Sequence, residues 1–303
     1  GLAYMVENIF AAGYYRLPIV MIGVNRTLGP PWNIWTDQGD TLMLRDAPWI
    51  QFYTESHQDL VDTILLAFRV AEDHRILLPA LVAQDGFVVS HTQMIVDLPE
   101  PEQVDRYLPP CDLPHRLHGK SVTVGGMTFP HETEVHRHEI QQAMERVPEV
   151  LAEAIDEFEK IFGRRPHGLL SAEYTEDADT VVIACNTMAR TLRRVVKRRR
   201  EKGEKIGMIK AKLFRPFPRA AYVQAVGAAQ RVAVLDRNHS PGSGGIFWTE
   251  VATSLREKPN LLLQDYLVGL GGGDVTPELI DEICDDLAAR QRSDEPVWKE
   301  VLA

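Results

Sequence analysis

The chain has 303 residues, of which 45% are hydrophobic and 25% are charged, and its formal net charge is −10. This length suits two domains of ordinary size, and no apolar tract is long enough to span a bilayer. The acidic balance argues against nucleic acid or an anionic membrane as a partner.

The first elements predict an α/β domain over residues 1–96. The opening GLAYMVENIFAAG places its apolar side chains on one helical stripe, and Gly13 is expected to end that helix. A strand over 17–24, a helix over 56–73 and a buried strand over 76–87 follow, an alternation typical of parallel sheets. The chain begins with a helix and not with the strand that precedes it in a βαβ repeat. We therefore expect an N-terminally incomplete chain, or one completed by another polypeptide.

Residues 97–138 predict a linker, because they contain many prolines and histidines and show little periodicity. The histidine spacing is not diagnostic of a metal site. We interpret these side chains as solvated or locally hydrogen-bonded, with a zinc site as the alternative. The histidines concerned are His115, His118, His131, His136 and His138.

Residues 139–290 predict a second α/β domain, and 291–303 form a tail. A long helix over 139–163 is expected to end at Gly163 and to be kinked or divided at Pro148. Four strands separated by helices predict a small doubly wound sheet. These strands are 179–185, 205–214, 231–237 and 260–270.

Two local patterns refine the second domain. Thr276 and Pro277 have the spacing of an N-cap and a first helical position, which predicts where the last helix begins. The basic run RRVVKRRREKGEK (193–205) fits the polar face and end of a helix. The cysteines Cys111, Cys185 and Cys284 form no CxxC pair. This usage is typical of a reducing cytoplasm and predicts no metal or iron–sulfur site within the chain.

Several stretches together resemble one enzyme family. RLPIVMIGVNR, PPWNIWTDQGDTLMLRDAPWIQFYTESHQD and DGFVVSHT are similar to the first domain of the α subunit of 2-oxoacid:ferredoxin oxidoreductases. GEKIGMIKAKLFRPFP, VAVLDRNHSPGSGG and VGLGGGDVTPE are similar to the second domain of that subunit. Pyruvate:ferredoxin oxidoreductase is the most similar member. The resemblance implies a partial, pyrimidine-side thiamine-diphosphate-type domain, followed by a smaller transketolase-C-terminal-like domain.

The resemblance also implies the reaction and its cofactors. Family members convert a 2-oxoacid such as pyruvate and coenzyme A to an acyl-CoA and CO2, and pass the electrons to ferredoxin. Thiamine diphosphate and Mg²⁺ belong to the assembled complex and are bound mostly by partner chains of the β, γ and δ types. Iron–sulfur clusters lie on partner chains only. We therefore expect activity only in the hetero-oligomer.

The resemblance assigns one substrate residue, Arg26. A planar guanidinium at the carboxyl end of a strand suits a carboxylate, which it meets through two hydrogen bonds. The family arginine occupies this position, and the neighbouring Asn25 is predicted to lie near the cofactor or substrate. The alternative is an Arg26 paired with an aspartate of its own loop, namely Asp37, Asp40 or Asp46. The activating glutamate of the family is not assigned, and Glu7, on a helix, is not expected to replace it.

Other interpretations stay open. The glycine-rich segment SPGSGGIF (240–247) is either a structural turn or a cradle for a phosphate of coenzyme A. The substrate is pyruvate or, as the PPWNIWTDQ stretch allows, a branched-chain 2-oxoacid such as 2-oxoisovalerate. A truncated, non-catalytic scaffold chain is the remaining alternative.

Overall fold

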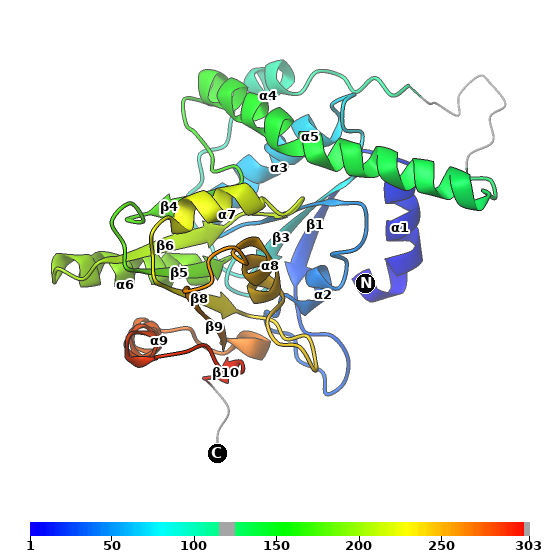
Figure 1. The fold of residues 1–303 in the computed structure, drawn as a ribbon. Helices are drawn as coiled ribbons and strands as arrows, with labels where there is room; N and C mark the ends of the chain where they lie inside the picture. The colour runs from blue at the N-terminus through cyan, green and yellow to red at the C-terminus, as the bar shows by residue number, and fades with distance from the viewer. Residues whose placement is uncertain (115–124, 300–303) are drawn as a thin grey trace.

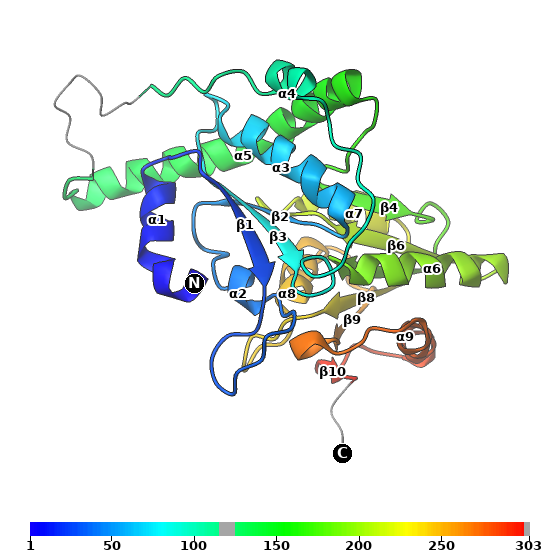
Figure 2. The same ribbon diagram turned by 180° about the vertical axis from the view of Figure 1, so that it is seen from behind.

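A computed structural model describes residues 1–114 and 125–299, which form two α/β domains (Figure 1, Figure 2). The first is built on a sheet of order β1-β3-β2-β7, and the second on a sheet of order β10-β9-β8-β5-β6-β4. The central strands of both sheets run parallel. The prediction of an α/β protein with parallel sheets is confirmed.

The first sheet lies between two layers of helices (Figure 2). Its parallel strands are β1 (Val20–Asn25), β3 (Ala80–Asp85) and β2 (Ile50–Tyr53). One face packs on α3 (His57–Ala71) and α5 (Pro130–Phe162). The other face packs on α1 (Val6–Tyr14) and the residues that follow α2 (Gly39–Leu42). All six residues of β3 are buried, so the central strand appears in the sequence as a nearly continuous apolar run.

The second sheet is also covered on both faces. Its strands are β4 (Leu170–Glu173), β5 (Thr180–Cys185), β6 (Ile206–Ala211), β8 (Arg231–Asp236), β9 (Leu262–Leu267) and β10 (Val297–Trp298). One face packs on α6 (Met188–Glu201) and α9 (Pro277–Ala289). The other packs on α7 (Arg219–Val226) and α8 (Ile246–Ser254). The Thr276 hydroxyl accepts from the Leu279 amide, as an N-cap does, so the predicted start of α9 is confirmed.

The long helix differs from its prediction in two ways. It begins at Pro130, inside the predicted linker, and it continues through Pro148 without a break to Phe162. It belongs to the core of the first sheet, not to the second domain, because Val147, Leu151 and Phe158 pack in the same cluster as α3 and β2. Gly163 ends the helix in the left-handed conformation, as predicted. The linker also contains the short helix α4 (Pro101–Tyr107).

The predicted strand 205–214 divides between the two sheets. Its first part is β6, and its last residues enter β7 (Leu213–Arg215), which runs antiparallel to β2 in the first sheet. A single apolar run thus joins the domains. The short strands β2, β4 and β10 were not predicted. In β2 the buried Gln51 interrupts the apolar pattern, and its amide donates to the Leu44 carbonyl at 2.8 Å.

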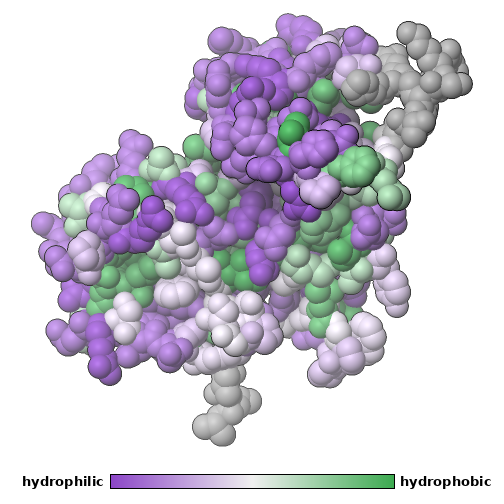
Figure 3. Space-filling model, turned by 45° about the vertical axis from the view of Figure 1, so that its right-hand side comes forward, coloured by the Kyte–Doolittle hydropathy of each residue, from purple (hydrophilic) through white to green (hydrophobic). Residues whose placement is uncertain are grey.

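The molecular surface shows the usual mixture of side chains (Figure 3). Hydrophilic side chains cover much of the face in view, with smaller hydrophobic patches between them. Among the described helices, none is long and apolar enough to cross a membrane.

Gly13 does not end α1. It lies inside the helix, where an added Cβ would come within 2.4 Å of Pro48 Cγ and 2.9 Å of the Pro48 carbonyl oxygen. We expect Gly13→Ala to destabilise the chain by about 1–3 kcal/mol, because a well-packed contact must shift. Gly126→Ala is the control, since no atom lies within 4 Å of its added Cβ. Equal melting temperatures for the two variants in a thermal scan would contradict the packing role of Gly13.

Candidate functional site

Arg26 follows β1 directly and leaves its side chain exposed at the carboxyl edge of the first sheet. Its backbone amide donates to Asp40 Oδ2 at 3.0 Å, and its Nε donates to the Ile34 carbonyl at 3.2 Å. Within residues 1–114 and 125–299, no aspartate forms an ion pair with the guanidinium, so the alternative of a loop salt bridge gains no support. The terminal nitrogens remain available to an external anion.

Asn25 and Asp40 support the backbone at Arg26 through hydrogen bonds. Asn25 is fully buried, and its Nδ2 donates to Asp40 Oδ1 and to Thr41 Oγ1, both at 2.8 Å. Asp40 also accepts from the Thr41 amide at 2.7 Å. Burial raises the pKa of Asp40 to about 6, although these hydrogen bonds oppose the rise. The contacts give Asn25 an anchoring role, and its contact with a cofactor stays a prediction.

Asp85, the last residue of β3, connects the two domains. Its carboxylate accepts from Thr36 Oγ1 at 2.9 Å, from Asn186 Nδ2 at 3.0 Å and from the Thr187 amide at 3.0 Å. Arg237 Nη1 lies 3.4 Å from the same carboxylate. Asn186 adopts a positive φ of 50°, which turns the chain between β5 and α6 toward the first sheet. The carboxyl edges of the two sheets therefore meet at one buried carboxylate.

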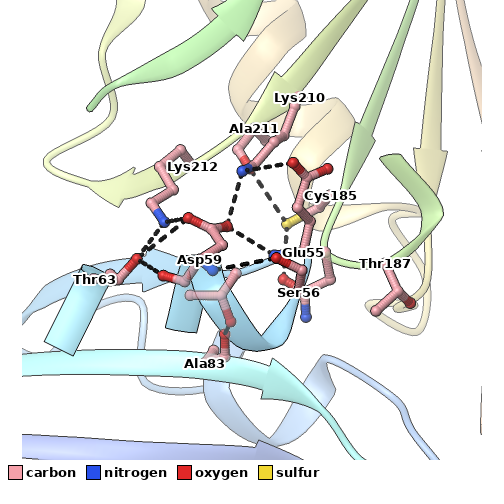
Figure 4. Close-up of polar contacts among 12 residues, drawn as sticks. Glu55, Ser56, Asp59, Thr63, Ala83, Cys185, Thr187, Lys210, Ala211 and Lys212 are labelled. Carbon is pink, nitrogen blue, oxygen red and sulfur yellow. Dashed lines mark hydrogen bonds and ion pairs between the residues drawn. The ribbon is translucent and has the colours of Figure 1, made fainter. Parts of the chain in front are cut away.

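A buried ionic cluster lies beside this junction (Figure 4). Lys210 and Lys212 come from the run shared by the two sheets, and both side chains are inaccessible to solvent. The Lys210 ammonium lies 2.8 Å from Asp59 Oδ2, and the Lys212 ammonium lies 2.5 Å from Asp59 Oδ1. Lys212 also donates to Thr63, and Glu55 lies 3.3 Å from Lys210. Asp59, in the first turn of α3, thus contacts both buried ammonium groups, and Glu55 contacts one of them.

The charges of this cluster shift one another's pKa. Burial alone would raise the pKa of Asp59, but the neighbouring ammonium groups of Lys212 and Lys210 hold it well below its usual range. Burial lowers the pKa of Lys212 to about 8, against the opposing effect of Asp59. The cluster is therefore built around an ionised Asp59.

Backbone amides at the end of the glycine-rich turn 240–247 donate hydrogen bonds to aspartate side chains of the protein itself. At the start of α8 the Phe247 and Trp248 amides donate to Asp236 at 3.1 Å and 2.9 Å. The Gly245 amide donates to Asp265 at 2.7 Å. Because these amides already donate to carboxyl groups of the same domain, the geometry favours the structural turn over a phosphate cradle.

Two glutamates of the described chain bear on the activating role that the resemblance leaves unassigned. Glu55 follows β2 at the carboxyl edge, but Arg193 holds its carboxylate at 3.0 Å and Lys210 at 3.3 Å. Glu7 is exposed in the first turn of α1. The Glu55 carboxylate is therefore engaged in ion pairs, and the activating glutamate stays unassigned. Arg26 as the substrate residue stays a prediction.

No group of three or more His, Cys, Asp or Glu in the described part of the chain has the geometry to hold a metal ion. His115 and His118 of the zinc alternative lie outside the described residues.

A cleft of about 550 Å³ opens between the Arg26 loop and the second domain. Trp35 and Phe87 line one side, with ring centroids 5.9 Å apart, and Arg190 and Arg237 line the other. Sequence reasoning missed Asp85 as the centre of this junction. Its signal in the sequence is a carboxylate near the end of the predicted strand 76–87, directly before a glycine.

Comparison with known proteins identifies the same family over both domains. Residues 1–156 match the family model described as pyruvate flavodoxin/ferredoxin oxidoreductase, thiamine diphosphate-binding. Residues 178–280 match the model for pyruvate:ferredoxin oxidoreductase core domain II. Both family models agree with the resemblance noted in the sequence.

Three curated relatives cover most of the chain. Pyruvate synthase subunit PorA of Methanothermobacter thermautotrophicus is 40% identical over 284 residues, which are 93% of this chain and 73% of that protein. PorA of Pyrococcus furiosus is 41% identical over 288 residues, 93% of this chain and 72% of that protein. Ketoisovalerate oxidoreductase subunit VorA of Pyrococcus abyssi is 37% identical over 290 residues, 95% of this chain and 73% of that protein.

One solved structure has the same fold. The 2-oxoglutarate:ferredoxin oxidoreductase from Magnetococcus marinus superposes with a TM-score of 0.66 at 17% identity. The match covers 94% of this chain and 51% of that one, so this chain spans about half the length of the solved protein. At this identity the likeness concerns the fold alone.

The ionic cluster predicts a large effect for one substitution. Asp59→Asn leaves the buried Lys212 without its carboxylate, and such a loss costs about 3–5 kcal/mol of unfolding free energy. The control is Asp156→Asn, whose exposed pair with Arg165 is expected to contribute little. Chemical denaturation of both variants measures the difference, and similar midpoints would contradict the role of the cluster.

The same residue predicts an acid dependence. The folded pKa of Asp59 lies below its unfolded value, so its contribution to stability is present above the unfolded pKa of about 4. That contribution is lost as the pH falls through the folded value. Asp59→Asn should therefore lose less stability than the parent chain between neutral and acidic pH. An unchanged acid dependence would show that Asp59 is not ionised in the folded protein.

Proposed function

The chain belongs to the pyruvate:ferredoxin oxidoreductase family, and we propose that it is the α-type subunit of a complex that oxidises pyruvate. In this reaction pyruvate is decarboxylated in the presence of coenzyme A, giving acetyl-CoA and CO2, and two electrons pass to ferredoxin. The exposed guanidinium of Arg26 is the main support for a role of this chain in the reaction. Hydrogen bonds from its Nε and its backbone amide hold Arg26 at the edge of the first sheet.

The geometry of Arg26 suits a 2-oxoacid. A guanidinium binds a carboxylate through two parallel N–H···O bonds, and this pairing orients the adjacent carbonyl. Among the described residues the guanidinium donates through Nε alone, to the Ile34 carbonyl at 3.2 Å, so the terminal nitrogens can receive the substrate. The role of Arg26 is to bind and orient the substrate, while the oxidation itself belongs to cofactors that the assembled complex supplies.

Two curated relatives named above are pyruvate synthase subunits, and this supports pyruvate over a branched-chain substrate. The second candidate substrate is 2-oxoisovalerate, which the 37% identity to the ketoisovalerate oxidoreductase subunit favours. Comparing kcat/KM for pyruvate and 2-oxoisovalerate distinguishes the two. Turnover of neither by the assembled complex would favour the non-catalytic scaffold.

The proposal includes partner chains. Thiamine diphosphate and Mg²⁺ are bound mostly by partners of the β, γ and δ types, and the iron–sulfur clusters lie on those partners. The description of the first family model as thiamine diphosphate-binding supports the presence of this cofactor in the complex. Burial of Cys185 and Cys284 as thiols is consistent with the proposed cytoplasmic location.

Arg26→Ala in the assembled complex tests the proposal. Removing a charged hydrogen-bonding partner costs about 2–5 kcal/mol, which is roughly 30-fold to several-thousand-fold in kcat/KM for the 2-oxoacid. Arg26→Lys should recover only part of this loss, because it keeps the charge without the planar fork. Saturation by coenzyme A and by ferredoxin should change little. If Arg26→Ala lowers the melting temperature while its folded fraction uses pyruvate normally, Arg26 only supports the loop.

Asp40 provides a further test of the same site. Asp40→Asn places an N–H group opposite the Arg26 or Thr41 amide, so the start of the loop must shift. We expect KM for the 2-oxoacid to rise by about tenfold, the equivalent of one hydrogen bond to a charged group. The exposed Asp46→Asn carries the same charge change and should leave KM unaltered.

The pH dependence of KM follows from the same contact. Because the pKa of Asp40 is about 6, its carboxyl group becomes protonated as the pH falls below that value. The protonated group is a weaker acceptor for the hydrogen bond from the Arg26 backbone amide. KM of the parent complex should therefore rise on the acid side of pH 6. This rise should disappear in Asp40→Asn, and its persistence there would assign it to another group.

A further inference from the structure

The loop that begins at Arg26 is attached to the second domain at several points, one of which is a hydrogen bond between the Asp37 carboxylate and the Gly271 backbone. The Gln38 amide donates to the Arg237 carbonyl at 3.0 Å. Nearer to Arg26, Asn33 Nδ2 donates to the Gly271 carbonyl at 2.9 Å, although the two residues are 238 positions apart. The loop that carries the guanidinium is thus part of the first domain, but hydrogen bonds to the second domain hold it in place.

Asn33 organises the middle of this loop. Its side-chain oxygen accepts from the Trp35 amide at 2.7 Å, and its carbonyl accepts from the Thr27 hydroxyl. These bonds fix the backbone on both sides of Ile34, whose carbonyl receives Arg26 Nε at 3.2 Å. Each polar group of the Asn33 side chain is therefore used, one within the loop and one across the domain boundary.

The receiving turn requires glycine. Gly271 and Gly272, the last two residues of the short 3-10 helix η2 (Leu270–Gly272), have φ values of 62° and 87°. An added Cβ on Gly272 would lie 2.3 Å from Trp35 Cβ, and one on Gly271 would lie 2.8 Å from Asn33 Nδ2. The close approach of the loop and the turn is possible because neither glycine has a side chain.

We propose that Asn33 is a positioning residue for substrate binding, and that the Gly271–Gly272 turn of the second domain sets, through Asn33, where Arg26 presents its guanidinium. The inference rests on the proposed role of Arg26 as the partner of the substrate carboxylate. It makes the second domain part of the substrate site, because a contact that crosses the boundary holds the carbonyl that aligns the arginine.

Asn33→Asp in the assembled complex is the direct test. The substitution keeps the acceptor for the Trp35 amide but removes the donor to Gly271 and turns a carboxylate oxygen toward a carbonyl. We expect KM for pyruvate to rise by about tenfold, as for the loss of one hydrogen bond, while kcat and KM for coenzyme A stay close to those of the parent. Asn260→Asp is the matched control, because it makes the same chemical change at an exposed residue before β9.

A double-mutant cycle with Arg26→Ala separates positioning from general stability. If Asn33 acts through Arg26, Asn33→Asp adds little further loss in the Arg26→Ala background. Fully additive losses, or an unchanged KM in Asn33→Asp alone, would overturn the inference while leaving Arg26 as the substrate residue. If Arg26→Ala itself leaves KM unchanged, the proposed function of Arg26 fails first.

Gly272→Ala approaches the same contact from the second domain. Its Cβ would displace Trp35, so KM for pyruvate should rise as it does in Asn33→Asp. Gly242→Ala is its control, because Gly242 also has a positive φ, of 81°, but no atom lies within 4 Å of its added Cβ. A rise in KM in both glycine variants would indicate a general effect of backbone strain and would count against the positioning role.

Discussion

The arrangement of the molecule depends on a buried ion cluster between its two sheets. One buried segment supplies β6 to the second sheet and β7 to the first. Lys210 and Lys212 lie where this segment passes from one sheet to the other. Ammonium groups without access to solvent are tolerated only with a carboxylate in contact, and Asp59 provides it from the first turn of α3. Because that pairing allows little displacement, it restricts how the two domains can sit against each other.

This placement brings the carboxyl edges of both sheets together. Asp85 at the end of β3 then reaches Asn186 and Thr187 at the start of α6, and Asn25 reaches Asn186 from the other side. The Asp85 carboxylate thus has hydrogen-bond donors from both domains, in keeping with the cost of burying a charge unpaired. Arg26 differs from these residues, since it stands at the rim with its terminal nitrogens exposed. Its proposed role is to bind the carboxylate of the substrate.

Two glycine-rich segments show how similar compositions serve different purposes. In 240–247 the chain turns so that the α8 amides bind Asp236 and Asp265, which makes the segment a closed structural unit. In 269–272 the glycines instead provide space for Trp35 and leave a carbonyl for Asn33. The glycine-rich composition of the two segments does not distinguish these roles. The difference lies in whether a carboxylate of the same domain or a loop of the other domain is nearby.

The sequence by itself determined the fold class, the order of most helices and strands, the N-cap at Thr276, the end of the long helix at Gly163 and, through resemblance, the family, while the role of Arg26 stays a prediction. These features are local, because periodicity and capping depend on neighbouring residues. The tertiary structure decided the rest. It assigned α5 to the first core and divided 205–214 between two sheets, since a buried apolar run has the same pattern in either sheet. It also placed Asp59 between two lysines about 150 residues away and Asn33 against Gly271, contacts between distant segments that no local pattern encodes.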